Sequence, residues 1–300
     1  MAWLELSLTV SADKQASIES ALDDLGALAI TLQDSDADTP DERAIFEPGV
    51  GETPLWNEIV VQALFDADAD RAGLVHALTD LVPDISPEHI AFRDVVDQDW
   101  TRAWMDTFHP MQFGRRLWIF PWNVEPPLDP GNVVVRLDPG LAFGTGTHPT
   151  TALCLAWLDS LDLSGKTVID FGCGSGVLAI AALKLGAARV IGVDNDDQAI
   201  LASRHNADRN GVSEKLDLYT PERFAVIEGD VLVANILAGP LAELADHFAH
   251  CLKPDGLIAL SGILKGQEQE LLSRYAASFD DLAAAERDGW IRISGTRRLR

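Results

Sequence analysis

Glycine and aspartate concentrate in one short turn that follows an apolar run, Asp170-Phe-Gly-Cys-Gly-Ser-Gly176. Glycine permits positive φ and a close approach of ligand to backbone, and a helix starting here would offer free N–H groups. Dinucleotide sites prefer the spacing G-x-G-x-x-G, but the third position of that pattern is Val177. A carboxylate at Asp170 would repel a pyrophosphate and attract a cationic amino group. The turn therefore predicts a site for S-adenosylmethionine, with Asp170, Gly172 and Gly174 as contacts.

A second acidic residue, Asp194, ends the next apolar run along the chain, Arg189–Val193. A carboxylate at the tip of this strand can accept hydrogen bonds from both hydroxyls of a ribose, a geometry that NAD sites share. Asp194 therefore predicts an adenosine-containing ligand without distinguishing the two cofactors.

The apolar run Val231–Ala234 ends abruptly in a polar residue, Asn235. At the carboxyl end of a parallel sheet, its amide oxygen can accept a hydrogen bond from an incoming amine. The lone pair of that nucleophile would then be aimed at the reacting carbon. Asn235 is the predicted catalytic residue, and it is also expected to contact the cofactor.

The segment Leu137–Thr151 is rich in glycine and hydroxyl groups and is unusually apolar for a loop. It is predicted to fold over the cofactor, with Phe143 against the ligand and Thr151 hydrogen-bonding at the start of the next helix. His148 invites a role as general base, but a lone loop histidine is more often structural. We therefore name no dedicated base.

The elements that must position these residues alternate between strand and helix from residue 166 onward. This alternation predicts an α/β fold with a Rossmann-like, mostly parallel, doubly wound sheet, whose ligands bind beyond the carboxyl ends of the strands. Strands are predicted at 167–171, 189–194, 216–219, 230–236, 257–261 and 290–294, the last as an edge strand, and helices at 177–185, 197–210, 241–252 and 266–275.

At 300 residues the chain is long enough for two domains. Residues 1–97 read as a smaller α+β domain in the order βαββαβ, which is typical of the ferredoxin-like fold. In it Asp68 is expected to cap the second helix. Residues 98–125 are predicted to form a linker that includes a short helix carrying Trp100 and Trp104, and residues 126–300 form the cofactor domain.

The formal net charge of −24 repels phosphate backbones and attracts basic partners. The acidity is concentrated at the front, because residues 1–98 hold 21 Asp and Glu against 4 Lys and Arg. We expect a docking surface for a basic protein, although acidity for solubility alone is an equal alternative.

The remaining composition predicts a cytoplasmic protein without a metal site. The N-terminus lacks a basic leader and a signal-like apolar run, and no apolar run is long enough to span a membrane. Three cysteines without paired spacing, Cys154, Cys173 and Cys251, are expected to be small buried residues rather than metal ligands or nucleophiles.

Four stretches resemble the bacterial ribosomal protein L11 methyltransferases of the PrmA type, a family of class I S-adenosylmethionine-dependent methyltransferases. The glycine turn is common to many methyltransferases, whereas the loop and the Asn-Ile-Leu-Ala tetrapeptide are far more specific. The stretches are residues 104–114, Leu137–Thr151, Asp170–Gly176 and Asn235–Ala238.

This resemblance implies methylation of lysine ε-amines and of the N-terminal α-amine of ribosomal protein L11. It also implies that the domain of residues 1–97 binds that protein. It also implies cofactor contacts at Thr151, Gly172, Asp194 and Asn235, with Phe143 as a further contact. We expect a monomer. We also expect that the reaction requires no nucleic acid, because no aromatic residue follows Asn235 to stack on a flipped base. The alternatives are an NAD-dependent oxidoreductase and a non-catalytic binding module for a basic protein.

Overall fold

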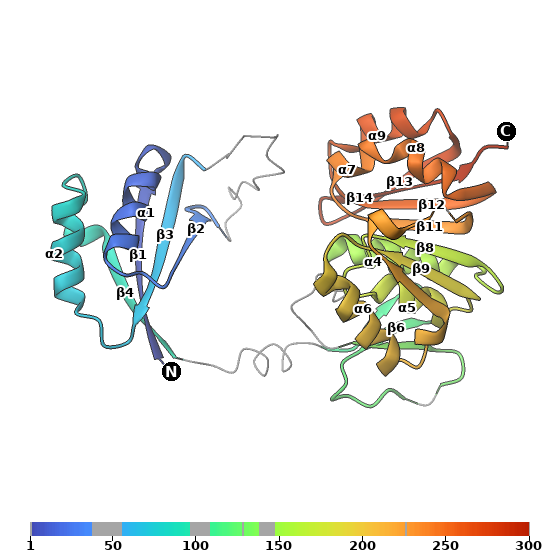
Figure 1. Ribbon diagram of the computed structural model, residues 1–300, viewed down its shortest axis with the longest axis horizontal. Helices are drawn as coiled ribbons and strands as arrows, with labels where there is room; N and C mark the ends of the chain where they lie inside the picture. The colour runs from blue at the N-terminus through green and yellow to red at the C-terminus, as the bar shows by residue number, and fades with distance from the viewer. Residues whose placement is uncertain are drawn as a thin grey trace. The chain divides into compact units, whose positions relative to one another are not determined.

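The computed structural model describes residues 2–37, 56–96, 109–127, 129–137, 148–225 and 227–299. The chain divides into two compact units, Met1–Asp99 and Trp100–Arg300 (Figure 1). The helix expected near Trp100 and Trp104 lies outside the described residues.

The first unit is a four-stranded antiparallel sheet in the order β2-β3-β1-β4, with two helices. Alternating leucines of β1 and apolar residues of β3 point into one core with Ile18 and Leu22 of α1. This is the predicted ferredoxin-like order. Its elements are β1 (Ala2–Ser11), α1 (Gln15–Asp24), β2 (Ala29–Asp34), β3 (Glu58–Asp66), α2 (Arg71–Leu81) and β4 (Ile90–Val96).

The cap of α2 differs from the expectation. Asp70, not Asp68, is the N-cap, because its side chain accepts a hydrogen bond from the N–H of Ala72. The chain enters the helix two residues later than the sequence pattern indicated.

The second unit is built on a seven-stranded sheet in the order β10-β9-β8-β11-β12-β14-β13. The first five of these strands are parallel, and β14 runs antiparallel to both of its neighbours. This confirms the predicted Rossmann-like class. The strands are β8 (Thr167–Phe171), β9 (Arg189–Val193), β10 (Leu216–Tyr219), β11 (Gly229–Asn235), β12 (Leu252–Leu264), β13 (Phe279–Arg287) and β14 (Trp290–Arg297).

Two groups of helices bury the two faces of this sheet in separate cores (Figure 1). One core contains buried residues of α4, α5 and α6, and the other contains buried residues of α7, α8 and α9. The helices are α4 (Pro149–Ser160), α5 (Val177–Lys184), α6 (Asp197–Arg209), α7 (Ala238–Glu243), α8 (Ala245–His250) and α9 (Glu268–Tyr275).

Two expectations for the end of the chain were wrong. The strand predicted at 290–294 is not at the edge, because β13 pairs with its outer side. The single helix predicted at 241–252 is two short helices, α7 and α8, which meet at Leu244.

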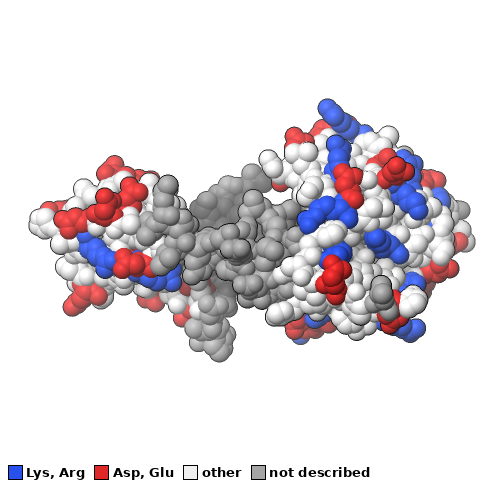
Figure 2. Space-filling view, turned by 90° about the horizontal axis from the view of Figure 1, so that it is seen from below, with Lys and Arg blue, Asp and Glu red and all other residues white. Residues whose placement is uncertain are grey.

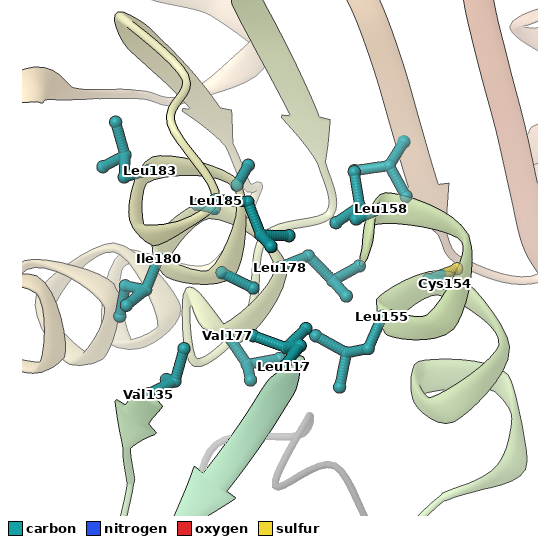
Figure 3. Packing of buried hydrophobic residues seen from close by; sticks show 14 of the residues in the cluster. Leu117, Val135, Cys154, Leu155, Leu158, Val177, Leu178, Ile180, Leu183 and Leu185 are labelled. Carbon is teal, nitrogen blue, oxygen red and sulfur yellow. The ribbon is translucent and has the colours of Figure 1, made fainter. Parts of the chain in front are cut away.

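Residues 111–120 form two strands that belong to the second unit. They form β5 (Met111–Phe113) and β6 (Leu117–Phe120), which continue with β7 (Val133–Arg136) into a small three-stranded sheet. Leu117 and Val135 pack against Leu155 of α4 and Val177 of α5 (Figure 3). The small sheet therefore covers helices that carry the site.

The three cysteines lie buried as free thiols. Within the described ranges, no helix is long and apolar enough to cross a membrane. In the same residues no three His, Cys, Asp or Glu side chains gather in a way that could hold a metal ion.

Candidate functional site

The sheet order brings the glycine turn and Asn235 together. Strand β8 lies between β9 and β11, so the chain leaves β8 in one direction and returns to its other side. Such a reversal opens a crevice at the carboxyl ends of the two strands. The turn after Phe171 and the end of β11 at Asn235 both lie at this edge, because Ala234 pairs with Phe171.

The glycine turn adopts the backbone conformation that its composition predicts. Gly172, Gly174 and Gly176 have φ of 79°, 54° and 79°, in the left-handed region that favours glycine. A Cβ on Gly172 would lie 2.2 Å from Cγ2 of Ile236, the residue after Asn235. Position 172 therefore requires glycine both for its φ and for the close approach of β11.

Asp194 is bonded directly to the glycine turn. Its Oδ2 accepts a hydrogen bond from the N–H of Gly174 at 2.8 Å, and its Oδ1 accepts one from the N–H of Asp196 at 3.0 Å. The carboxylate is half-buried at the end of β9. Both sequence motifs thus meet at one point, while the contact of Asp194 with a ribose stays a prediction.

Asp170 lies beneath the turn rather than in the open crevice. Its side chain is fully buried, and Oδ2 accepts a hydrogen bond from the N–H of Ala179 at 3.0 Å. The N-cap of α5, Gly176, has no side chain to cap this helix, so Asp170 serves in its place. Burial, with the nearby carboxylate of Asp194, raises the pKa of Asp170 to about 7. Its direct contact with a ligand amino group stays a prediction.

Asn235 has one partnered and one unpartnered side-chain atom. Its Nδ2 donates a hydrogen bond to Oγ1 of Thr151 at 3.3 Å, whereas its Oδ1 is buried and has no hydrogen-bond partner among the described residues. An unsatisfied buried acceptor is costly, so it calls for a specific explanation such as a donor supplied by a ligand or substrate. Thr151 is itself fully buried and fixes the amide plane.

His148 is the N-cap of α4, and this position accounts for its chemistry. Its Nδ1 lies 2.7 Å from Oγ1 of Thr150 and accepts from the N–H of that residue. The ring also contacts Trp290 edge to face, with 4.7 Å between the ring centroids. Burial lowers the pKa of His148. The lone pair that a general base would use is thus engaged in the cap, which supports the structural interpretation.

Two residues of α6 were missed by the sequence reasoning. Oγ of Ser203 donates to the carbonyl of Gly174 at 2.9 Å, and Nδ2 of Asn206 donates to the carbonyl of Ser175 at 2.8 Å. These hydrogen bonds hold the turn against α6, in addition to its bond to Asp194. The available signal was a pair of polar residues three apart on a helix that follows the glycine turn.

Phe143 and most of the Leu137–Thr151 loop lie outside the described residues. Its two ends are described: Leu137 is buried beside β7, and His148 begins the cap of α4. The predicted contact of Phe143 with the cofactor stays a prediction.

The described residues fit S-adenosylmethionine. The carboxylate of Asp194 suits the hydroxyls of a ribose, and carboxylates at positions 170 and 194 would oppose a pyrophosphate. Gly174 has no Cβ that would keep a ligand away from the backbone of the turn. The unpartnered Oδ1 of Asn235 marks the place where a donor is missing. Chemically, this arrangement can bind an adenosine derivative and orient an incoming N–H group.

Comparison with known proteins gives one family over nearly the whole chain. The profile of the family described as ribosomal protein L11 methyltransferase (PrmA) matches residues 2–298. Proteins named ribosomal protein L11 methyltransferase from Xylella fastidiosa (strain 9a5c) and Xanthomonas euvesicatoria pv. vesicatoria (strain 85-10) are 54% and 55% identical, each over 99% of this chain and 100% of their own length. The one from Pseudomonas aeruginosa (strain LESB58) is 51% identical over 99% of both chains.

A solved structure agrees with this family. The ribosomal protein L11 methylase from Lactobacillus delbrueckii subsp. bulgaricus superposes with a TM-score of 0.57 and is 32% identical. The match covers 64% of this chain and 99% of that one.

Proposed function

The chain belongs to the ribosomal protein L11 methyltransferase family, and on that premise we propose that it transfers methyl groups to amines of ribosomal protein L11. Its cofactor is S-adenosylmethionine, as the family and the Rossmann-like fold imply. The alternative of an NAD-dependent oxidoreductase is not favoured, because the family is one of methyltransferases and the third dinucleotide glycine is replaced by Val177.

One observation carries the proposal that the acceptor is an amine: the buried, unpartnered Oδ1 of Asn235 at the carboxyl end of β11. An amine N–H can donate to this oxygen and so point its lone pair toward the reacting carbon. Thr151 holds the amide by accepting from Nδ2. Asn235 is therefore the proposed catalytic residue.

The cofactor would be held by the glycine turn and its neighbours. We propose contacts at Thr151, Gly172, Gly174, Asp194 and Asn235, with Asp170 and Phe143 as further contacts. The cofactor supplies an electrophilic methyl group on positively charged sulfur, and the electron pair of the breaking C–S bond stays with that sulfur. The protein's part is to position the amine and exclude water.

The amine must reach Asn235 without its extra proton. A lysine ε-amine has a pKa of about 10.4 in water and is therefore an ammonium group at neutral pH. After this proton passes to solvent, the nitrogen lone pair forms the new N–C bond. We propose that both lysine ε-amines and the N-terminal α-amine are acceptors.

We propose that residues 1–97 recognise the substrate and that residues 126–300 carry out the transfer, joined through residues 98–125. Acidic side chains predominate over basic ones on the visible face of the first unit in Figure 2, which suits a basic partner. The net charge of −24 supports a reaction that requires no nucleic acid. We further propose a cytoplasmic monomer.

A direct assay tests this function. The purified chain is incubated with labelled S-adenosylmethionine and ribosomal protein L11, and intact-mass and peptide mass spectrometry locate the methyl groups. We expect methylated lysines and a methylated N-terminus on L11, but none on a basic control protein of similar size. Absence of methyl transfer to L11 would overturn the substrate, and binding without transfer would leave only the binding module.

A further inference from the structure

We propose that Trp290 forms an aromatic wall beside Asn235, at the place where the acceptor amine binds, and that its indole attracts the substrate ammonium and the methylated product. This inference rests on the proposed function, since it concerns the acceptor side of the same site. It depends on the placement of Trp290, at the start of β14, relative to Asn235 and the first turn of α4.

Strand order places Trp290 at the edge of the sheet where Asn235 ends. Asn235 pairs with Ser261 in the parallel strand β12, and Trp290 pairs with Leu264, three residues further along β12. Because β14 is antiparallel to β12, its first residue lies at the carboxyl end of the parallel strands. The hydroxyl of Ser261 donates to the carbonyl of Ile291 and ties the two strands at this point.

The side chains of Trp290 and Asn235 also share one face of the sheet. Along β14, Ile291 and Ile293 are buried in the core formed with α7, α8 and α9. Alternation therefore turns Trp290 toward the opposite face, where α4 lies. Arg292, two residues on, confirms this direction because its Nη1 donates to the carbonyl of Leu153 in α4.

The first turn of α4 contacts both residues. Thr151 accepts a hydrogen bond from Asn235, and His148, three residues earlier, lies against Trp290 with 4.7 Å between ring centroids. The two rings meet at 70°, an edge arrangement. Trp290 remains only partly buried. The helix thus braces the indole and the catalytic amide as one unit.

An indole suits this reaction better than a carboxylate would. The acceptor arrives as an ammonium group, and its methylated products are again cations near neutral pH. A carboxylate would raise the pKa of the amine and oppose loss of the proton. An aromatic face attracts alkylammonium groups without accepting a strong hydrogen bond from nitrogen. Burial lowers the pKa of the neighbouring His148, which disfavours a competing positive charge there.

The first test does not depend on the substrate. The full chain, with 15N-labelled tryptophan, is titrated with tetramethylammonium chloride, and the Trp290 indole signal is identified as the one missing from Trp290→Phe. We expect a saturable shift of this signal that exceeds the shifts of the other indoles. No shift of the Trp290 signal, or equal shifts of all indoles, would overturn the aromatic wall.

The second test measures methylation of L11. For Trp290→Leu we expect kcat/KM for L11 to fall about fivefold, because a cation–π contact is worth on the order of 1 kcal/mol. The Kd for S-adenosylmethionine, measured by calorimetry, should change less than about twofold. Trp290→Phe should recover most of the loss. Trp118→Leu, which removes a half-buried tryptophan of the small sheet, is the matched control.

The outcomes separate the two proposals. Equal kcat/KM for Trp290→Leu and Trp118→Leu would overturn the role of Trp290, whatever the substrate. If the wild-type chain transfers no methyl group to L11 but Trp290 still responds to tetramethylammonium, the proposed substrate fails and the aromatic wall stands.

Discussion

Asn235 owes its proposed role to the state of one atom. Many asparagines end strands because they form turns, and such a position alone predicts little. Here Nδ2 donates to Thr151, and within the described part of the chain the buried Oδ1 has no partner. Nδ2 therefore holds the side chain in place, and Oδ1 is available to accept a hydrogen bond from the incoming amine.

Replacing Asn235 by alanine should lower kcat about 100-fold, the usual effect of removing one preorganised polar contact at a reacting centre. The fold should survive, since the replaced amide makes one hydrogen bond to the residues that the structure describes. Steady-state methylation of L11 with saturating cofactor measures kcat, and thermal unfolding serves as the control. An unchanged kcat would remove Asn235 from the mechanism.

The raised pKa of Asp170 predicts that its contribution to stability falls as pH rises, which is the opposite of a typical surface carboxylate. Its pKa is raised from 3.8 to about 7 in the folded chain, so the folded state holds this proton where the unfolded state has lost it. Stability is therefore lost as pH rises from about 4 to about 7. Asp170→Asn can still accept from Ala179, and it does not titrate.

The unfolding midpoint of Asp170→Asn should therefore rise relative to wild type as pH increases across this window. Thermal melts of both proteins at pH 5.0 and 7.5 provide the comparison. A difference that does not vary with pH would contradict the raised pKa. Calorimetry on the same variant tests the predicted ligand contact, because losing a carboxylate that binds the cofactor's ammonium group must weaken cofactor affinity.

At the scale of elements, the site is a turn held from several sides. The carboxylate of Asp194 accepts a hydrogen bond from the N–H of Gly174. Ser203 and Asn206 of α6 donate hydrogen bonds to two carbonyl groups of the turn. Ile236, which follows β11, lies over the position where Gly172 lacks a Cβ. Three secondary-structure elements thus fix one turn.

Gly172→Ala should cost more stability than Gly165→Ala, although the two glycines have nearly the same φ of 79° and 73°. Either substitution costs about 1 kcal/mol for placing alanine at positive φ. A Cβ at 165 meets nothing within 4 Å, whereas one at 172 meets Ile236 at 2.2 Å. Overpacking should then add about 1–3 kcal/mol at position 172.

Thermal unfolding and cofactor calorimetry of the two variants measure this difference. We expect Gly165→Ala to retain cofactor affinity and Gly172→Ala to lose it. Equal losses of stability would mean that the approach of β11 does not constrain the turn.

At the scale of the whole molecule, charge is distributed unevenly along the chain. Residues 1–98 carry most of the net charge of −24, and the remainder of the chain is closer to neutral. A field of one sign speeds and strengthens encounter with a basic protein and has little influence on a small ligand held in a crevice.

The KM for L11 should therefore rise about tenfold between 50 and 300 mM NaCl, because salt screens exposed charges beyond a Debye length. The KM for S-adenosylmethionine should change less than about twofold over the same range, since its contacts are short and partly buried. Initial rates at both salt concentrations measure the two constants. A KM for L11 that does not respond to salt would show that the acidic residues 1–98 do not contribute to binding of L11.

Local pattern was sufficient for much of this molecule. Hydrophobic periodicity of two or near 3.6 depends only on neighbouring residues, so both fold classes and most strands were predicted from it. The glycine turn, Asp194 and Asn235 were identifiable because each sits where an apolar run stops. Strand β13 was not, since its adjacent aspartates and its run of three alanines resemble an exposed loop.

Tertiary structure decided what each polar group is for, because its partners come from distant parts of the chain. The sequence predicts a ligand contact for Asp170, and the folded chain adds a second role, because its buried side chain caps α5. His148 became the N-cap of α4, and its ring contacts Trp290, which is 142 residues away in the sequence. Sequence alone fixes neither, since strand order and the faces of the sheet decide which residues meet.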